Sequence, residues 1–210
     1  MTTKRESAMY RVLTAMLLTA LVGMTVALTM TSPQDPHDVI LVQDQRSFEG
    51  VGRCKTCHKK PEQGEQFRLW SEGRHAKAFE TLASEEAAAI AAEKGIENPQ
   101  TADECLTCHV TAHGVAEELL GKRFKVEDGV GCESCHGAGG DYYKKKTMKA
   151  LFAGEIEPES VGLVVQTEEV CTACHNEESP TFKEFNFEER VKEIAHPIPE
   201  GGAAAADEEG

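Results

Sequence analysis

Four copies of the pattern Cys-x-x-Cys-His use all eight cysteines of this 210-residue chain. Two thiols at this spacing can form thioethers with the two vinyl groups of one porphyrin, and the histidine that follows can ligate the iron from the same side. The pattern therefore predicts four covalently attached c-type haems (heme c, iron). The attaching cysteines are Cys54, Cys57, Cys105, Cys108, Cys132, Cys135, Cys171 and Cys174, and the proximal iron ligands are His58, His109, His136 and His175.

Three other interpretations of paired cysteines compete with haem attachment. They are zinc sites made of four cysteines, a disulfide framework, and thioredoxin-like redox centres. None of them requires a histidine directly after the second cysteine, whereas all four copies have one. The sequence therefore favours haem attachment.

The N-terminus has the features of an export signal. Lys4, Arg5 and Arg11 are followed by an uncharged apolar stretch that extends to residue 30, as in a basic region followed by a hydrophobic region. Residues 1–30 are predicted to be either a cleaved signal peptide or a retained N-terminal membrane anchor, because the stretch is close to the shortest that spans a bilayer. Either outcome places the rest of the chain in the periplasm or on the outer face of the cytoplasmic membrane.

The formal net charge of −14 at pH 7 limits the partners that this chain can attract. A strongly acidic surface repels nucleic acid and anionic lipid, so we expect no nucleic-acid partner. A basic redox protein is the complementary electron donor or acceptor. The same charge also serves simple solubility.

The composition leaves little material for an ordinary apolar core, since aromatic residues make up only 6% of the chain. The porphyrins would supply much of the buried apolar area, and folding would depend on haem attachment. We expect a mainly α fold of short helices and loops wrapped around four covalently bound haems, with little or no sheet. Residues 31–47 are predicted to form a linker, residues 48–200 the tetrahaem domain, and residues 201–210 a disordered acidic tail.

Local signals predict two helices in the region of the second motif. Ser84 is the expected N-cap of an alanine-rich helix that ends at Gly95. Thr101 and Glu104 have the spacing of a capping box, which would place the second motif on the first turns of a helix.

The C-terminal part of the domain has weaker signals. Thr167 is expected to open the helix that carries the two cysteines of the fourth motif, and residues 188–195 are expected to form a last helix that ends before Pro197. A short apolar piece at residues 161–165 is the one candidate strand.

The second axial ligand of each iron separates electron transfer from small-molecule chemistry. His75 is a candidate ligand, because it lies beside aromatic residues at a predicted helix start, and so is His196, which closes the last helix. His113 is either a ligand to a neighbouring haem or an exposed loop residue. His37 lies in the linker and is not expected to be a ligand. Met148 is the one methionine beyond residue 30, so methionine ligation is open to one haem at most.

Five segments of the tetrahaem domain carry a family resemblance. They include Arg74-His75-Ala-Lys-Ala and Gly129-Val-Gly-Cys-Glu-Ser-Cys-His-Gly137, together with residues 48–59, 105–110 and 185–196. In this order they resemble the tetrahaem cytochrome c-554 family.

The resemblance implies a mainly helical fold with closely packed haem pairs for rapid electron transfer. It implies that His75 ligates the third haem, attached beside His136, and that His196 ligates the fourth, beside His175. The second haem, beside His109, would be five-coordinate. Nitrifying members of the family accept electrons from hydroxylamine oxidoreductase, so a donor like that enzyme is implied here.

The chain departs from the family pattern after the third motif. The family places a histidine there as the second ligand of the first haem, but residues 139–149 contain none. Met148 lies close to the expected place, and His113 is the alternative.

The sequence predicts an exported tetrahaem protein that transfers electrons between redox protein partners, with no catalytic residues of its own. The main alternative is a haem enzyme that reduces nitric oxide, nitrite or hydroxylamine at an open haem site. A third hypothesis is a subunit of a polymeric haem wire or of a membrane quinol-oxidising complex, to which the N-terminal segment would contribute an anchor.

Overall fold

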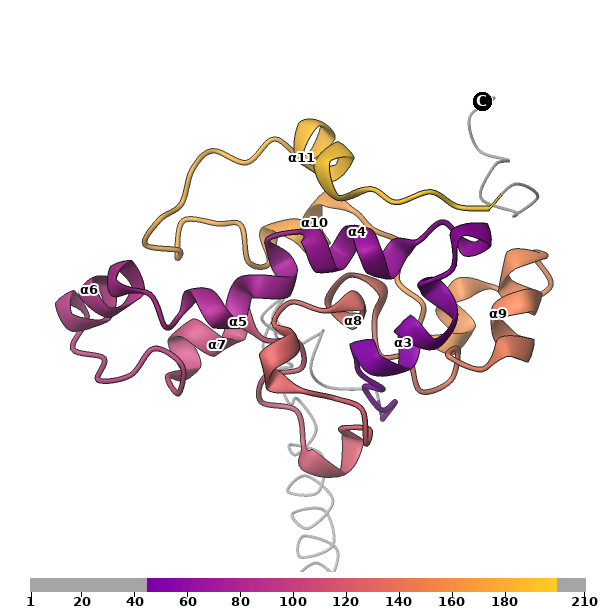
Figure 1. Ribbon diagram of the computed structural model, residues 1–210, viewed down its shortest axis with the longest axis horizontal. Helices are drawn as coiled ribbons and strands as arrows, with labels where there is room; N and C mark the ends of the chain where they lie inside the picture. The colour runs from indigo at the N-terminus through magenta and orange to yellow at the C-terminus, as the bar shows by residue number, and fades with distance from the viewer. Residues whose placement is uncertain (1–44, 200–210) are drawn as a thin grey trace, which may run out of the picture. The chain divides into compact units, whose positions relative to one another are not determined.

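Short helices joined by loops make up the part of the chain that the computed structural model describes, residues 45–199 (Figure 1). The only β-bridge within this range is an isolated parallel one between Phe48 and Leu120. The expected mainly α fold with little or no sheet is therefore confirmed. The α-helices are α3 (Val51–His58), α4 (Gln66–Glu72), α5 (Ala78–Thr81), α6 (Glu85–Glu93), α7 (Asp103–His109), α8 (Cys132–His136), α9 (Lys145–Phe152), α10 (Glu168–Thr172) and α11 (Phe187–Ile194).

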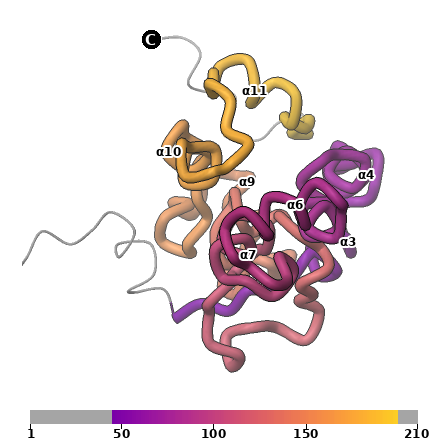
Figure 2. Tube along the Cα trace, turned by 90° about the vertical axis from the view of Figure 1, so that its left-hand side faces the viewer, coloured from indigo at the N-terminus to yellow at the C-terminus, as the bar shows by residue number. Residues whose placement is uncertain are grey.

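Single turns of 3-10 helix fill several connections between these helices. They are η1 (Pro61–Gln63), η2 (His75–Lys77), η3 (Glu117–Leu119), η4 (Val126–Asp128) and η5 (Pro158–Val161). The first motif helix α3 packs on α4 and on α8, and α5 packs on α7. Figure 2 shows α3 and α4 lying side by side.

Several predictions about domain organisation lie outside the described residues. They are the signal peptide or membrane anchor at residues 1–30, most of the linker, the acidic tail, and His37. The described residues all belong to one compact unit, residues 44–210. Within residues 45–199 no helix has the length and apolarity needed to cross a membrane.

Two of the predicted helices begin with a side-chain cap. The Ser84 hydroxyl accepts a hydrogen bond of 3.1 Å from the Ala87 amide at the start of α6, which confirms the predicted N-cap. The Asn186 side chain accepts one of 3.2 Å from the Glu189 amide at the start of α11. Such caps satisfy amides that have no partner inside the helix. The last helix lies within one residue of its predicted bounds.

The predicted capping box before the second motif is wrong. Helix α7 begins after Ala102, and no side chain caps it. The Thr101 hydroxyl donates to the Asn98 carbonyl at 3.2 Å in the preceding turn, and Ala102, one residue later, takes the N-cap position. The second motif nevertheless lies on a helix, as expected.

The fourth motif is only partly helical. Thr167 precedes α10, but the helix ends at Thr172 and therefore contains Cys171 without Cys174. The Cys174 amide donates to the Cys171 carbonyl at 3.2 Å, in the turn that follows.

The strand predicted at residues 161–165 is absent. Val161 ends η5, and Gly162 adopts a left-handed conformation with φ of +75°, which interrupts any extended run. The Val164 amide then donates to the carbonyl of His136 at 3.0 Å. This apolar piece lies against the third motif instead of pairing with another strand.

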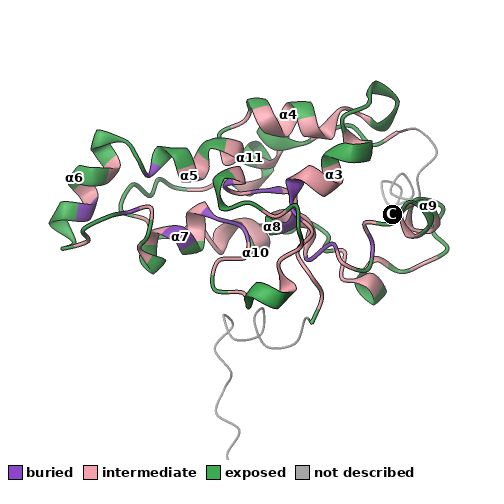
Figure 3. Cartoon of the chain, turned by 60° about the horizontal axis from the view of Figure 1, so that its bottom comes forward, coloured by how far each residue is buried: buried purple, intermediate pink, exposed green. Residues whose placement is uncertain are grey.

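The apolar core of the described residues is small. Leu82, Leu106 and Val110 form a buried cluster between α5 and α7, with Phe79 and Phe124 packed against it. No side chain within residues 45–199 falls below 2% exposure. Figure 3 shows exposed and intermediate residues along most of the helices and short buried stretches between them. The protein atoms alone therefore bury little apolar area, as the composition predicted.

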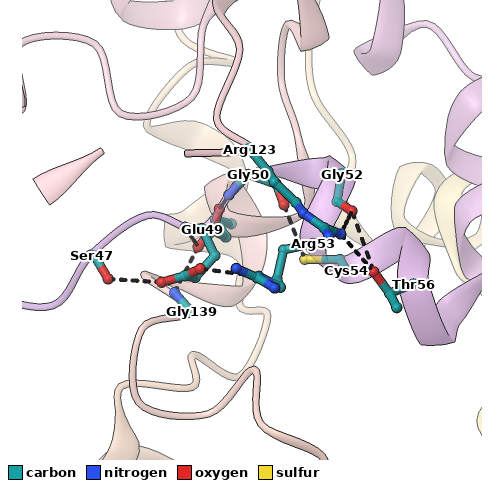
Figure 4. Close-up of polar contacts among 10 residues, drawn as sticks. Ser47, Glu49, Gly50, Gly52, Arg53, Cys54, Thr56, Arg123 and Gly139 are labelled. Carbon is teal, nitrogen blue, oxygen red and sulfur yellow. Dashed lines mark hydrogen bonds and ion pairs between the residues drawn. The ribbon is translucent and has the colours of Figure 1, made fainter. Parts of the chain in front are cut away.

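A buried carboxylate joins the first and third motifs. Glu133, inside the third motif, is only 4% exposed and accepts hydrogen bonds from the amides of Glu49 at 2.8 Å, Gly50 at 2.7 Å and Gly139 at 2.7 Å (Figure 4). Burial raises the pKa of Glu133, and the three amide donors act against that rise. The amides of Glu49 and Gly50 lie just before α3, and Glu133 lies in α8. The carboxylate therefore holds the start of α3 against α8.

Replacing Glu133 with alanine should lower the free energy of unfolding by about 1–3 kcal/mol, because buried amides lose their acceptor. Guanidinium denaturation of the haem-loaded protein would measure this change. The control is Glu118→Ala, which removes an equal charge from an exposed position and should stay within about 0.5 kcal/mol of the wild type. Equal unfolding midpoints for Glu133→Ala and the wild type would contradict this role.

Candidate haem sites

The four motifs lie on different short helices, and within residues 45–199 none of their thiols forms a disulfide. The first motif lies on α3, the second on α7 and the third on α8, while the fourth begins in α10. Cys57 is exposed and the other seven cysteines are half-buried. Thioether attachment requires thiols that are not held in disulfides.

The thiols of different motifs lie against one another in pairs. A hydrogen bond with Cys132 is the largest cause that raises the pKa of Cys54, and one with Cys108 does the same for Cys174. The first motif therefore adjoins the third, and the second adjoins the fourth. Cys135 and Cys171 also interact electrostatically, which places the third motif near the fourth.

Three of the four motif histidines have a partner at Nδ1. His58 Nδ1 lies 3.3 Å from the Gln66 side-chain oxygen, and His109 Nδ1 lies 2.7 Å from the Ala78 carbonyl. His136 Nδ1 lies 2.9 Å from the side-chain amide of Gln166. A proton held at Nδ1 by a carbonyl oxygen leaves Nε2 unprotonated and free to ligate a metal. The first and second motifs thus present imidazoles in the form that haem iron requires.

The two candidate distal histidines each lie beside a motif histidine. The ring centres of His75 and His175 are 6.1 Å apart with an interplanar angle of 64°, and those of His136 and His196 are 5.8 Å apart at 38°. Two imidazoles that ligate one metal ion from opposite sides through bonds of about 2.0 Å have ring centres roughly 6 Å apart. Both pairs therefore have the spacing of an axial ligand pair.

The ring contacts differ from the ligand pairs that the family resemblance implies, and those ligand pairs stay a prediction. The resemblance pairs His75 with His136 and His196 with His175, whereas the rings in contact are those of His75 with His175 and of His196 with His136. The cause is that backbone and ring point to different motifs. The His75 carbonyl accepts a hydrogen bond of 3.1 Å from the Val130 amide, next to the third motif, while its ring lies against the fourth.

Burial keeps these imidazoles in the neutral form. It is the first cause lowering the pKa of His136 to about 4, with the His196 ring as the next cause. It also lowers the pKa of His75, of His175 and of His196. A neutral imidazole has the lone pair that metal ligation needs. The buried Nδ1 of His196 has no hydrogen-bond partner within the described residues, so that ring retains an unshared nitrogen.

A porphyrin supplies four nitrogens to its iron, so a haem site needs only two further ligands from the protein. Each imidazole pair offers two. Within residues 45–199 no group of three or more histidine, cysteine or carboxylate side chains converges on a bare metal ion. His175 is further held by the ring of Phe185, which stacks on it at 4.8 Å.

The structure places the two remaining ligand candidates away from these pairs. His113 Nε2 lies 3.0 Å from an oxygen of Asp103, at the start of its own motif helix. Met148 is half-buried on α9. The role of each as a ligand stays a prediction.

Sequence reasoning missed three side chains that hold the motifs in place. Gln66 and Gln166 contact the motif histidines His58 and His136, and Glu133 accepts from amides near the first motif. A single polar residue carries no spacing signal. Glu133 stands inside a motif, but the variable positions of that motif are not specified by haem chemistry.

Thioether attachment and axial imidazole ligation of haem define the c-type cytochromes, and the described residues include thiols and imidazoles of the kinds that both would use. The family described as cytochrome c554 and c-prime matches residues 53–137, which hold the first three motifs. Cytochrome c-554 of Nitrosomonas europaea is 30% identical over 176 residues, covering 70% of this chain and 73% of that protein. No solved structure matches the chain.

The chain belongs to the cytochrome c-554 family. Covalently bound c-type haem and a role in electron transport follow from this membership.

Replacing Gln66 with leucine should raise the midpoint potential of the haem at the first motif. The bond to His58 makes that imidazole a stronger donor, which favours ferric iron. The hydrogen bond that is lost contributes a net ~0.5–1.5 kcal/mol. For a one-electron couple this free energy corresponds to a shift in midpoint potential of about 20–60 mV. Spectroelectrochemical titration would measure the shift, with the exposed Gln63→Leu as control. A potential unchanged by Gln66→Leu would exclude this contact as a tuning element.

Proposed function

We propose that this protein is an exported tetrahaem electron carrier that passes electrons between redox protein partners. The observation that carries the proposal is the pair of imidazole contacts, His75 with His175 and His136 with His196, at the spacing of axial ligands. Haem iron ligated by two imidazoles has no open position and is suited to electron transfer. When bound, haem supplies one-electron exchange between ferric and ferrous iron.

The chain's own residues hold the four attachment sites close together. The contacts between cysteines of the first and third motifs and of the second and fourth, with the third near the fourth, support one continuous set of neighbouring sites. We propose that electrons cross the protein between the first and the fourth sites through the third, with the second site adjoining the fourth. The buried Glu133 holds the first and third sites in place.

The two other sites keep their proposed ligands. His58 and His109 would ligate the first and second haems, with Met148 or His113 as the second ligand of the first. The second haem would be five-coordinate. An open position there is where nitric oxide, nitrite or hydroxylamine would react if the protein were an enzyme.

Location and partners are proposed from the sequence. A cleaved signal or an anchor at residues 1–30 would place the haem domain outside the cytoplasmic membrane. A donor like hydroxylamine oxidoreductase is proposed by resemblance alone, and a basic partner would match the net charge of −14.

Mass spectrometry of the mature protein should find the added mass of four haems that resist acid–acetone extraction, because thioethers survive that treatment. A reversible redox titration of the same sample should account for four one-electron centres. Extractable haem, fewer than four haems, or centres that do not cycle reversibly would overturn the proposal. Four low-spin haems that ignore nitric oxide would exclude an open second site.

Alanine variants of the distal histidines should each convert one low-spin haem to high-spin. His75→Ala should affect the haem beside His175, and His196→Ala the haem beside His136. Haem signals of the fourth site can be assigned by nuclear magnetic resonance through contacts with the Phe185 ring, which stacks on His175.

Loss of the Phe185-linked low-spin signals in His196→Ala rather than in His75→Ala would reverse the pairing. His113→Ala is the matched control for histidine removal, and it should leave both bis-imidazole haems low-spin.

A further inference from the structure

Two segments that contain no acidic residue stand out in this acidic chain. Residues 51–60, around the first motif, and residues 142–154, around α9, together carry eight of the 22 lysines and arginines and no aspartate or glutamate. Arg53, Lys55, Lys59 and Lys60 belong to the first segment; Lys144, Lys145, Lys146 and Lys149 belong to the second. The positive charge of the chain is therefore concentrated in a few places.

The two segments meet in space at Tyr143. The Arg53 guanidinium lies 5.0 Å from the centre of the Tyr143 ring, and Lys144 Nζ lies 5.9 Å from it. Arg123 adds a further positive charge, because its guanidinium donates to the Gly52 carbonyl and the Thr56 hydroxyl of α3, each at 3.1 Å (Figure 4). We name these two segments with Arg123 the basic face.

The lysines of α9 are available to a partner. Lys144, Lys145, Lys146 and Lys149 are all exposed, and within residues 45–199 no ion pair involves them. Elsewhere on the face Arg53 is paired with Glu49 at 3.3 Å, and Lys60 with Glu62 at 3.8 Å. The uncompensated charge is therefore centred on α9.

The first motif opens onto this face. Its Cys57 is the exposed one among the eight motif thiols, and three lysines of the face lie on either side of it in residues 55–60. The fourth motif has the opposite surroundings, since residues 167–193 carry eight glutamates and three basic residues. The first motif therefore has basic surroundings and the fourth has acidic surroundings, which suit partners of opposite charge.

We propose that the basic face is the docking surface for an acidic redox protein, which exchanges electrons with this protein at the first motif. The inference rests on the proposed function, and it assigns a kind of partner to the first motif, which is one end of the proposed electron path. Clustered positive charge orients an acidic partner and speeds its encounter, whereas a net charge of −14 would otherwise repel it. A basic partner would fit the surroundings of the fourth motif.

An anionic lipid surface is the other occupant with matching charge. It is a poorer match, because an extended anionic membrane would also lie against the acidic remainder of the chain and be repelled by it. An acidic patch on a protein need only cover the basic face. A membrane would also cover the first motif, which an electron-exchange site must leave accessible to its partner.

The test compares two triple variants with the same change in net charge. Lys145→Gln/Lys146→Gln/Lys149→Gln removes charge from the basic face, and Lys94→Gln/Lys183→Gln/Lys192→Gln removes it elsewhere. The reduced haem-loaded protein is oxidised in a stopped-flow instrument by the anion hexacyanoferrate(III) and by the cation tris(phenanthroline)cobalt(III). The two rates report the electrostatic potential near the haem that exchanges electrons.

The face variant should slow oxidation by hexacyanoferrate(III) about tenfold at ~0.01 M ionic strength, and much less at ~0.15 M, where screening is stronger. Its oxidation by the cobalt complex should not slow. The control variant should change the hexacyanoferrate(III) rate by less than about twofold. Equal effects of the two variants would mean that only net charge matters, and would overturn the proposal.

Binding is measured separately from electron exchange. Hexacyanochromate(III), a redox-inert paramagnetic anion, should broaden amide signals of the basic face in the wild type and not in the face variant. Broadening spread evenly over the surface would overturn the proposal even in a protein whose haems exchange electrons. Failure of the proposed function would give a different result from failure of the docking surface. The haems would then not exchange electrons reversibly with either oxidant, while the broadening at the basic face would persist.

Vesicles of phosphatidylglycerol and phosphatidylcholine test the lipid alternative. The wild type should not cosediment with them at ~0.15 M salt. Cosedimentation that is lost in the face variant and kept in the control would assign the face to a membrane and overturn docking of an acidic protein.

Discussion

The scarcity of buried protein side chains is the constraint on which the rest of this structure depends. No side chain within residues 45–199 falls below 2% exposure, and the buried apolar cluster has three members, Leu82, Leu106 and Val110. Helices of no more than nine residues are marginal in water on their own. Covalently bound haem would therefore contribute to the fold as well as to the function, since a porphyrin offers an apolar surface on which short helices can pack. Hydrogen bonds from single side chains, above all those of Glu133, then fix one motif against another.

The same arrangement would allow a small acidic protein to serve two partners. The imidazole pairs, with ring centres 6.1 and 5.8 Å apart, are the proposed electron-transfer sites, while the first motif lies in a basic face and the fourth among glutamates. Entry and exit of electrons at surfaces of opposite charge would keep donor and acceptor from competing for one site. Contacts of the third motif's thiols with those of the first and the fourth support a short path between those surfaces.

The sequence predicted what covalent chemistry and local capping determine. The composition indicated the scarcity of core, and Ser84 specified the start of α6. The sequence did not predict features that depend on the tertiary fold. The Thr101 capping box was wrong because α7 has Ala102, one residue later, as its N-cap. The strand at residues 161–165 was wrong because Gly162 turns the chain toward the third motif. Nor did it predict which rings lie together, because the backbone of His75 lies beside the third motif and its ring beside the fourth.

A crystal structure of the haem-loaded protein, with data collected at the iron absorption edge, tests the central claim most directly. Anomalous scattering locates each iron without reference to the protein coordinates. The account predicts four iron atoms per chain, one between the rings of His75 and His175 and one between those of His136 and His196. Fewer than four iron atoms, or an iron beside His136 or His175 whose opposite axial ligand is not the histidine paired with it here, would contradict the account.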